Sequence, residues 1–472
     1  MSEKKYLYGA SIQGIQGFIF KTNKLKEIVG ASTLVEEITN AESTFPELNL
    51  QSGEKVMTAA GNIRYKLDEE TCKKVVYLLP KLVANYAPGI TISQAVVPIS
   101  EEGSADRNEL EKRLRTQRNK PVMPIDIGYM GLERARRTGG VGVEYKEEVL
   151  DRATQKKIKT REEDTVNLFE KATGTTNIKK SEVAFNIEDI TKGVNNSWLA
   201  IIHADGNSIG NKIRDLSEDQ LKDFSVKLED ATKSAAKKAF DEVVPKFNSE
   251  LKRYPIRPVI LGGDDLTVII RADLAFDYTV AYLKAFEEAT KEKLGQLTSF
   301  QNGLTACAGI SYIKDSYPFH YGVKLAEDLT KEAKKMSKEI NKDLPPSSLS
   351  FYKVQSSFTD GLEAMRQRTH QTIDKLYNFN YGPYLILENN GKACVNELRA
   401  GMEVIDKHSN DKSKGVSKLR QWLTMLHQDP SKAGFLMDRI KKVNSALYNE
   451  LKLEDKGKKN ILYDLIQLHS LK

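Results

Sequence analysis

The chain of 472 residues has few cysteines and no stretch typical of a membrane span or a secretion signal. Its three cysteines, Cys72, Cys307 and Cys394, lie far apart and form no C-x-x-C pair, so neither a disulfide framework nor a zinc site is indicated. No run reaches the roughly 18 apolar residues of a membrane helix. The opening Met-Ser-Glu-Lys-Lys leads into no apolar signal core. We therefore expect a cytoplasmic protein without zinc and without a membrane partner.

The composition is that of a globular protein with a modest excess of positive charge. Hydrophobic residues make up 40% of the chain, which is enough for a sizeable core at this length. Charged residues make up 29%, and the net charge is +7. Such an excess is compatible with polyanionic ligands such as nucleotides or RNA, although many proteins without such ligands have a similar balance.

The most informative stretch is Val259–Ile270, in which two apolar runs flank Gly262-Gly263-Asp264-Asp265. Apolar runs on both sides of a glycine-containing turn predict a β-hairpin. Glycine permits positive φ and close backbone approach. Two adjacent carboxylates at such a corner supply the hard oxygen ligands that Mg²⁺ prefers. Taken alone, the pattern fits an ordinary hairpin turn equally well.

A third carboxylate follows another apolar strand, Trp198–Ala204, which runs into Asp205-Gly206-Asn207-Ser208. An aspartate at a strand end, followed by a turn and a helix, offers backbone N–H groups to phosphates. In palm-type nucleotidyltransferases and cyclases, carboxylates on adjacent strands hold two metals that clamp the reacting phosphoryl group. We predict that three aspartates are catalytic and bind the metal: Asp205, Asp264 and Asp265. We predict that their neighbours contact the nucleotide: Gly206, Asn207, Ser208, Gly262 and Gly263.

One order of elements occurs twice along the chain. Apolar periodicity predicts a strand, a helix, a hairpin, a helix and a strand at 6–11, 15–38, 56–65, 67–86 and 89–97. The same order returns at 198–204, from 217, at 259–270, 274–295 and 304–312. This β-α-ββ-α-β order is that of a ferredoxin-like unit.

We therefore predict an α+β fold with two ferredoxin-like palm domains of the nucleotide-cyclase type and a mostly helical C-terminal domain. The expected boundaries are 1–125 for a degenerate first palm, 126–195 for a connector, 196–340 for the second palm and 341–472 for the helical domain.

The two units differ in their carboxylates. Aligned by sequence, Ala60-Gly61 corresponds to Gly262-Gly263, and Asn62 corresponds to the first aspartate of the second hairpin. The first strand ends at Ser11, where the second unit has an aspartate. We therefore expect the first palm to hold a nucleotide through Gly61 and Asn62 but to bind no catalytic metal.

Taken in order, these motifs resemble the large polymerase-palm (GGDD) subunit of type III CRISPR effector complexes and its smaller stand-alone relatives. The segments that carry the resemblance are Ser11–Phe20, Asn23–Ser32, Asp205–Asn207, Gly262–Asp265, Ala308–Ile310, Tyr317–Phe319, Leu325–Glu327, Ala333-Lys334 and Gly415–Arg420.

The resemblance implies a Mg²⁺- or Mn²⁺-dependent nucleotidyltransferase that joins ATP into cyclic oligoadenylate-type second messengers in antiviral defence. It also implies that Lys334 contacts the triphosphate. The partners that it implies are guide or target RNA and other effector subunits, or further copies of the chain.

The sequence departs from this family at two points. Members often begin with an HD phosphohydrolase domain, but no His-Asp dipeptide occurs here, so we expect no such domain. Many members carry a cysteine zinc element between the palms. In this chain Glu133–Gly140 occupies that place without cysteines, so we interpret the connector as a remnant of that element.

Two alternatives stay open. One is a palm cyclase that uses another nucleotide or makes another product. The other is a non-catalytic, RNA-binding scaffold that has kept the fold. The intact carboxylate set favours an enzyme, because nothing structural requires these acids to face one another.

Overall fold

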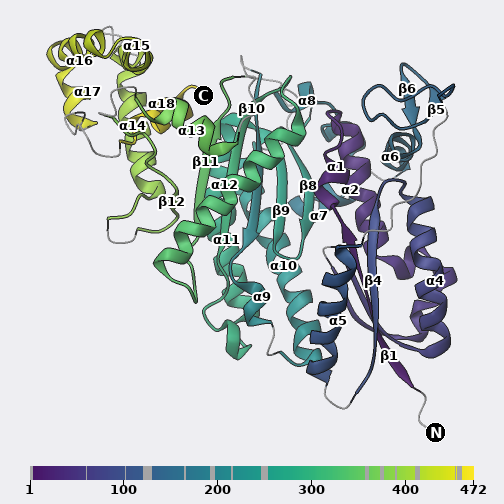
Figure 1. Ribbon diagram of the computed structural model, residues 1–472. Coiled ribbons are helices and arrows are strands. Elements are labelled where there is room, and N and C mark those ends of the chain that lie inside the picture. The colour runs from purple at the N-terminus through teal and green to yellow at the C-terminus, as the bar shows by residue number, and fades with distance from the viewer. Residues whose placement is uncertain are drawn as a thin grey trace.

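The structure, a computed structural model, describes residues 4–59, 61–100, 103–120, 130–163, 166–191, 197–213, 216–245, 253–356, 361–372, 377–388, 391–409, 415–451, 453 and 460–472. The fold is mixed α+β, as predicted, with two palm domains followed by a helical region (Figure 1). Ala60 of the first hairpin lies outside the described residues, as does the predicted boundary at 125/126.

The first palm contains a four-stranded antiparallel sheet in the order β2-β3-β1-β4. Its strands are β1 (Lys5–Gln13), β2 (Glu54–Ala59), β3 (Asn62–Asp68) and β4 (Thr91–Pro98). Its helices are α1 (Ile15–Ile19), α2 (Leu25–Thr39), α3 (Ala41–Thr44) and α4 (Glu69–Tyr86), with short 3₁₀ turns η1 (Pro46–Leu48) and η2 (Leu50–Ser52). Buried residues that alternate along the strands, such as Tyr8 and Ala10, pack beneath α2 and α4.

The helix predicted over 15–38 is two helices, α1 and α2. The chain leaves the helical path between them, where the Thr22 hydroxyl accepts the Lys24 N–H at 3.1 Å and donates to the Glu27 carboxylate. Threonine hydroxyls compete in this way with the hydrogen bonds of a continuous helix. Apolar periodicity carries no signal for such a break.

The second palm contains a six-stranded sheet in the order β12-β11-β10-β7-β9-β8. Its strands are β7 (Trp198–Gly206), β8 (Ile256–Gly262), β9 (Asp265–Arg271), β10 (Ala306–Lys314), β11 (Ser348–Lys353) and β12 (Tyr384–Leu385). The four strands β10-β7-β9-β8 repeat the order of the first sheet. β11 adds to them in parallel with β10, so the sheet continues past the expected boundary at 340.

Helices cover both faces of this second sheet. They are α9 (Ile209–Lys212), α10 (Glu218–Val243), α11 (Ala272–Leu294) and α12 (Phe319–Ile340), with the 3₁₀ turn η4 (Thr298–Phe300). Ala200 and Ile202 face the core formed with α10 and α11, whereas Leu199 and Ile201 face α12 and the first palm. α10 begins at a capping box in which the Ser217 hydroxyl accepts the Gln220 N–H.

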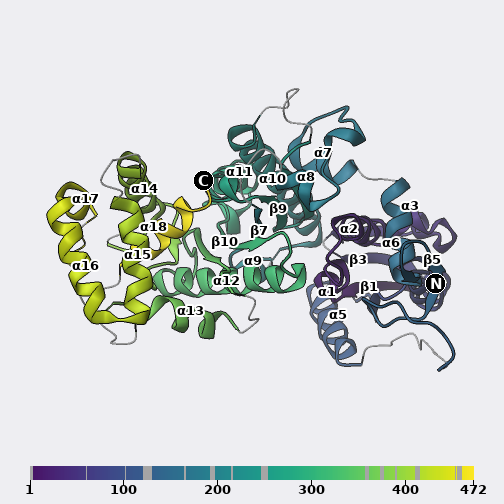
Figure 2. The same ribbon diagram turned by 90° about the horizontal axis from the view of Figure 1, so that it is seen from above.

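The two palms touch through α1 and α2, which lie beside β8 and the start of α12 (Figures 1 and 2). The Ser32 hydroxyl donates to the Val259 carbonyl, and the Phe319 N–H donates to Asn23 Oδ1 at 3.0 Å. Lys222 of α10 pairs with Glu54 of β2. Contacts from several elements therefore fix the first palm against one face of the second.

The first part of the segment between the palms packs on the first palm, and its last part packs on the second. Its elements are α5 (Gly103–Arg118), β5 (Gly142–Tyr145), β6 (Val149–Asp151), α6 (Arg152–Glu163), α7 (Asn167–Thr173), η3 (Lys180–Glu182) and α8 (Ile187–Thr191). The Arg137 guanidinium binds the carboxylates of Glu27 at 2.8 Å and Glu148 at 2.9 Å, and thereby fastens this segment to α2. The three cysteines of the chain are buried and free.

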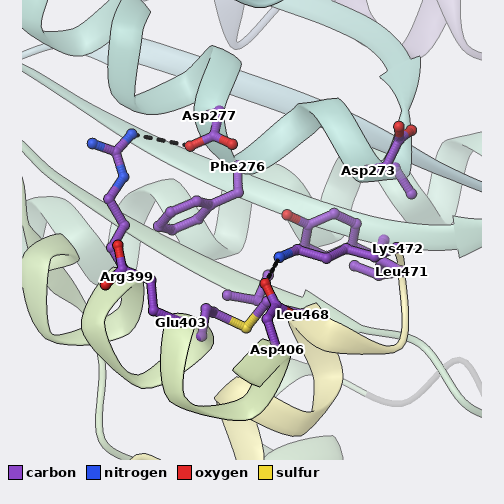
Figure 3. A pocket seen from close by; sticks show the side chains of 12 residues that line it. Asp273, Phe276, Asp277, Arg399, Glu403, Asp406, Leu468, Leu471 and Lys472 are labelled. Atoms are coloured by element: carbon purple, nitrogen blue, oxygen red, sulfur yellow. Dashed lines mark hydrogen bonds and ion pairs between the residues drawn. The ribbon is translucent and has the colours of Figure 1, made fainter. Parts of the chain in front are cut away.

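The C-terminal region is mostly helical. Its helices are α13 (Leu362–His370), α14 (Val395–Ser409), α15 (Gly415–Gln428), α16 (Pro430–Val443), α17 (Ser445–Glu450) and α18 (Leu462–His469). A cavity of about 210 Å³ lies where α14 and α18 meet α11. Figure 3 shows Arg399 reaching Asp277, at 3.0 Å, and Lys472 reaching Asp406 across this junction. In the described part of the chain, no helix combines the length and apolarity that crossing a bilayer requires.

Candidate active site

The Gly-Gly-Asp-Asp stretch forms a tight hairpin between β8 and β9. Gly262 pairs with Asp265, so the turn consists of Gly263 and Asp264 alone. Gly263 has φ 62°, a left-handed value that the first turn residue of such two-residue hairpins takes and that glycine adopts without strain. The buried hydroxyl of Thr232, on α10, donates to the Gly263 carbonyl at 2.6 Å. The second sheet and α10 together therefore fix the position of both aspartates.

Three carboxylates meet at this turn. Asp205 is the penultimate residue of β7, which pairs with β9, and it lies beside the hairpin. Asp205, Asp264 and Asp265 each place one carboxylate oxygen within 4.8 Å of the other two. Gly206 makes this approach possible, because a Cβ at that position would lie 2.9 Å from the Asp264 Cβ.

The triad carries more negative charge than its surroundings neutralise. Burial, and then the charge of Asp205, raises the pKa of Asp264 to about 6. Burial, and then the charges of the other two acids, raises the pKa of Asp265 well above its usual value. Lys334, on α12, opposes them: its Nζ lies 2.5 Å from Asp205 Oδ2 and donates to the Gly206 carbonyl at 2.7 Å. Three partly buried carboxylates facing one lysine fit a hard divalent cation.

The residues after Asp205 have other surroundings than the sequence predicts. Asn207 is buried: its backbone N–H donates to the Thr305 carbonyl at 2.8 Å, and its Nδ2 donates to Thr305 Oγ1 at 3.0 Å. Ser208 has φ 59° and precedes α9, which is only 4 residues long. The expected helix opening directly after the turn is thus a single short turn, and the long helix α10 starts later. Asn207 anchors β7 to the start of β10.

His203 lies on the same face of β7 as Asp205 but is not placed as a base. It is buried, and its Nδ1 lies 3.1 Å from Thr267 Oγ1. Burial lowers the pKa of His203 to about 4, so the ring is neutral at pH 7.

A cavity of about 730 Å³, here called the interpalm cavity, opens between the two hairpins. The predicted site residues that line it are Gly61, Asn62, Gly262, Gly263 and Asp265. The predicted residues that do not line it are Asp205, Gly206, Asn207, Ser208, Asp264 and Lys334. Asp265 therefore faces the cavity, while the rest of the triad lies just behind it.

Sequence reasoning missed several charged residues of this cavity. Arg118, at the end of α5, and Lys171, on α7, line it, and Lys171 pairs there with Glu36 of α2. Glu229 of α10 lines it as well. These residues come from four separate helices, and no local pattern distinguishes them from other surface charges.

The sequence alignment of the two hairpins was wrong by one position. In the first palm Ala59 pairs with Asn62, just as Gly262 pairs with Asp265 in the second. Asn62 therefore corresponds to Asp265, the second aspartate. Ser11 pairs with Asn62 and occupies the position of Asp205 in its own sheet. The first palm thus has a serine and an amide where the second has carboxylates.

A family model described as "Cas10/Cmr2, second palm domain" matches residues 198–343. The second palm of this chain is thus similar to the second palm of Cas10/Cmr2 proteins. No curated protein sequence matches the chain.

The fold of this Cas10-like chain is shared with solved Csm1–Csm4 structures. The cassette in complex with one ATP aligns at TM-score 0.59 and 14% identity, over 99% of this chain and 70% of the other. The cassette with pppApA aligns at TM-score 0.55 and 15% identity, over 100% of this chain and 70% of the other. The cassette with cA3 aligns at TM-score 0.54 and 16% identity, over 100% of this chain and 69% of the other. At these identities the likeness establishes the fold.

Proposed function

We propose that this Cas10-like protein joins ATP molecules into oligoadenylates, including cyclic ones, in the interpalm cavity. The observation that carries the proposal is the cluster of three carboxylates, one of which, Asp265, lines a cavity whose walls come from the hairpins of both palms. The solved proteins that share the fold were captured with ATP, pppApA and cA3, which are a substrate, an intermediate and a product of such a reaction.

Asp205, Asp264 and Asp265 are the residues that would hold Mg²⁺ or Mn²⁺. When bound, such ions polarise the α-phosphate, activate the attacking hydroxyl and stabilise the departing pyrophosphate. The oxygen donor set and the raised pKa values of Asp264 and Asp265 support this assignment, because a bound cation relieves the repulsion among the acids.

The chain itself positions the reactants. Gly262 and Gly263 present bare backbone to the cavity, so phosphates can approach the triad closely. We propose that Gly61 and Asn62 hold a second ATP on the first palm, without metal chemistry. The 3′-oxygen of one ATP then bonds to the α-phosphorus of the other, the bond to pyrophosphate breaks, and the hydroxyl proton leaves to water. Holding two reactants in register supplies several kcal/mol in favourable cases.

We also propose that the chain acts within a type III CRISPR effector, where other subunits and RNA are its partners. A Csm1–Csm4 subcomplex of the type III-A CRISPR-Csm interference complex shares its fold at TM-score 0.54 and 14% identity. The net charge of +7 is compatible with an RNA partner.

The test is product analysis with each of the four nucleoside triphosphates. The full chain is incubated with Mg²⁺ or Mn²⁺, and the products are identified by mass spectrometry. Oligoadenylates from ATP, lost in the Asp264→Asn, Asp265→Asn variant and kept in Asp241→Asn, are expected. Asp241 is an exposed α10 residue of the same palm, so its substitution controls for loss of charge. If products form from another nucleoside triphosphate, that nucleotide and not ATP is the substrate. If the chain binds no metal–nucleotide complex, the interpretation that remains is a non-catalytic scaffold.

A further inference from the structure

A second polar cavity, of about 360 Å³, lies between the edge of the second palm and the C-terminal helices. We call it the C-terminal cationic pocket. Its basic lining residues are Lys353 at the end of β11, Arg368 of α13, and Arg420 and His427 of α15. No aspartate or glutamate is among the described residues that line it. A cleft lined by charge of one sign raises the local concentration of ions of the opposite sign.

Lys353 lines this pocket and is buried. Its side chain is 8% exposed, and its ammonium donates to the Ser470 hydroxyl and lies 4.4 Å from the centre of the Trp198 ring. Within the described residues, no carboxylate is within ion-pair distance of it. Buried charges are normally paired, because removing them from water is costly.

The neighbours of Lys353 increase this imbalance. Lys314 shares the same indole ring, at 4.6 Å, and the Arg420 guanidinium borders the same pocket. Burial, followed by the charges of Lys314 and Arg420, lowers the pKa of Lys353 to about 8. The ammonium is therefore held where its surroundings disfavour its charge, and an anion in the pocket would reverse that effect.

We propose that the C-terminal cationic pocket binds a phosphate group carried by a nucleotide or a nucleic acid strand, with Lys353 and Arg420 as its main contacts. A planar guanidinium and an ammonium match the several oxygens of a phosphate. Apolar side chains of Leu423 and Ile466 border the same space and give a nucleoside a surface to contact.

This pocket is separate from the interpalm cavity. Among the described residues, the two cavities share no lining side chain. The pocket is built on β11, α13, α15 and α18, whereas the interpalm cavity is built on the two hairpins and the helices around them. The inference therefore stands whether or not the triad is catalytic.

The test compares Lys353→Met with Lys432→Met in the full chain. Lys432 is a well-exposed α16 residue of the same region, so its substitution removes the same charge elsewhere. Three probes are titrated in EDTA, which suppresses metal-dependent binding at the triad: inorganic phosphate, ATP and a short single-stranded RNA. We expect at least one probe to bind wild type and Lys432→Met about tenfold more tightly than Lys353→Met. The slope of log affinity against log salt concentration should also be steeper by about one for wild type and Lys432→Met.

The probe that discriminates identifies the source of the phosphate. Discrimination with ATP or phosphate indicates a nucleotide, and discrimination with RNA alone indicates a strand. Lys353→Met replaces an unpaired buried ammonium by an apolar chain, so its melting temperature without probe should be unchanged or higher. If it fails to fold, Arg420→Gln, at an exposed position, gives the same comparison. Equal affinity of all three probes for wild type and variant, within about twofold, would overturn the proposal.

Discussion

At the scale of single residues, the active-site account depends on three carboxylates that share one positive neighbour. Asp205, Asp264 and Asp265 repel one another, and Lys334 contacts only the first of them directly. The lysine therefore has two separable effects. It competes with divalent cations for Asp205, and it provides a positive group beside the place where we expect the triphosphate.

Lys334→Met should separate these two effects. Without the ammonium, we expect Mn²⁺ to bind the triad about threefold or more tightly, because a nearby like charge has been removed. We expect product formation to fall by about tenfold or more, because the triphosphate loses a contact. Calorimetry and product assays measure the two quantities, with Lys338→Met, on the exposed side of the same helix, as control. A parallel fall of metal affinity and activity would show that Lys334 acts through folding alone.

The aspartates could be found from the sequence because each carries its own local signal. Asp205 ends an apolar strand, and the other two occupy a glycine-rich turn. Arg118, Lys171 and Lys353 carry no such signal, since each is one of 72 lysines and arginines and gains its place only through tertiary contacts. The sequence also predicts that Asn207 contacts the nucleotide. It does not show that Asn207 is buried against Thr305, because that contact joins residues far apart in the sequence.

At the scale of elements, the position of the hairpin between β8 and β9 depends on the helix α10 behind it. The Thr232 hydroxyl donates to the Gly263 carbonyl and also to the carbonyl of its own helix at Leu228. The first bond joins α10 to the turn between β8 and β9. Elements far apart in the sequence thereby share the task of positioning Asp264 and Asp265.

Thr232→Val should loosen the hairpin without creating a cavity. It leaves the Gly263 carbonyl without its donor, so we expect the free energy of unfolding to fall by about 1 kcal/mol and activity to fall several-fold. The matched control is Thr279→Val on α11, a buried threonine whose hydroxyl bonds only within its own helix, at Ala275. Urea titration and product assays apply to both. Equal losses of activity in both variants would contradict a positioning role for Thr232.

Most helices and strands could be predicted, because their apolar residues recur with a simple period. The register between the strands could not be predicted in this way. The sequence predicts both hairpins, yet it aligned them one position out, since it contains no information on which residues close each turn. The paired residues Ala59 and Asn62, and Gly262 and Asp265, settle the alignment. The break between α1 and α2 was missed because a hydroxyl, and not a change of apolar period, produces it.

At the scale of the whole molecule, a buried polar cluster joins the second palm to the helical region. The Tyr384 hydroxyl, on β12, donates to the Asp464 carboxylate, on α18. Burial raises the pKa of Asp464 to about 7, and burial lowers that of His370, 3.9 Å away, to about 3. Between about pH 3 and pH 7 both groups are thus neutral when the helices are docked.

This cluster predicts a specific dependence of stability on pH. In the unfolded chain Asp464 ionises with its ordinary pKa of 3.8, whereas in the folded chain it keeps its proton up to about pH 7. Between these values the folded state binds more protons, so the free energy of unfolding falls as pH rises through this window and then levels off. Asp464→Asn still accepts the Tyr384 bond but cannot ionise. We expect wild type to lose about 2 kcal/mol or more, relative to this variant, between pH 5 and pH 8 in chemical denaturation. Parallel pH profiles of the two proteins would contradict this account.

The two-palm architecture could be predicted from the repeated order of elements, but not the space between the palms. That space depends on contacts such as Ser32 with Val259 and Lys222 with Glu54, which join residues more than 160 positions apart. The central claim is that the two palms hold two nucleotides in one cavity, and that the triad serves only one of them.

Calorimetric titration with a non-hydrolysable ATP analogue and Mg²⁺ tests this claim most directly. We predict two bound nucleotides for each wild-type chain, one of them dependent on the metal. The Asp264→Asn, Asp265→Asn variant should keep one, metal-independent nucleotide, and Asn62→Leu in that background should weaken it. A wild-type chain that binds one nucleotide, or a double variant that still binds two in a metal-dependent way, would contradict the proposed division of labour between the palms.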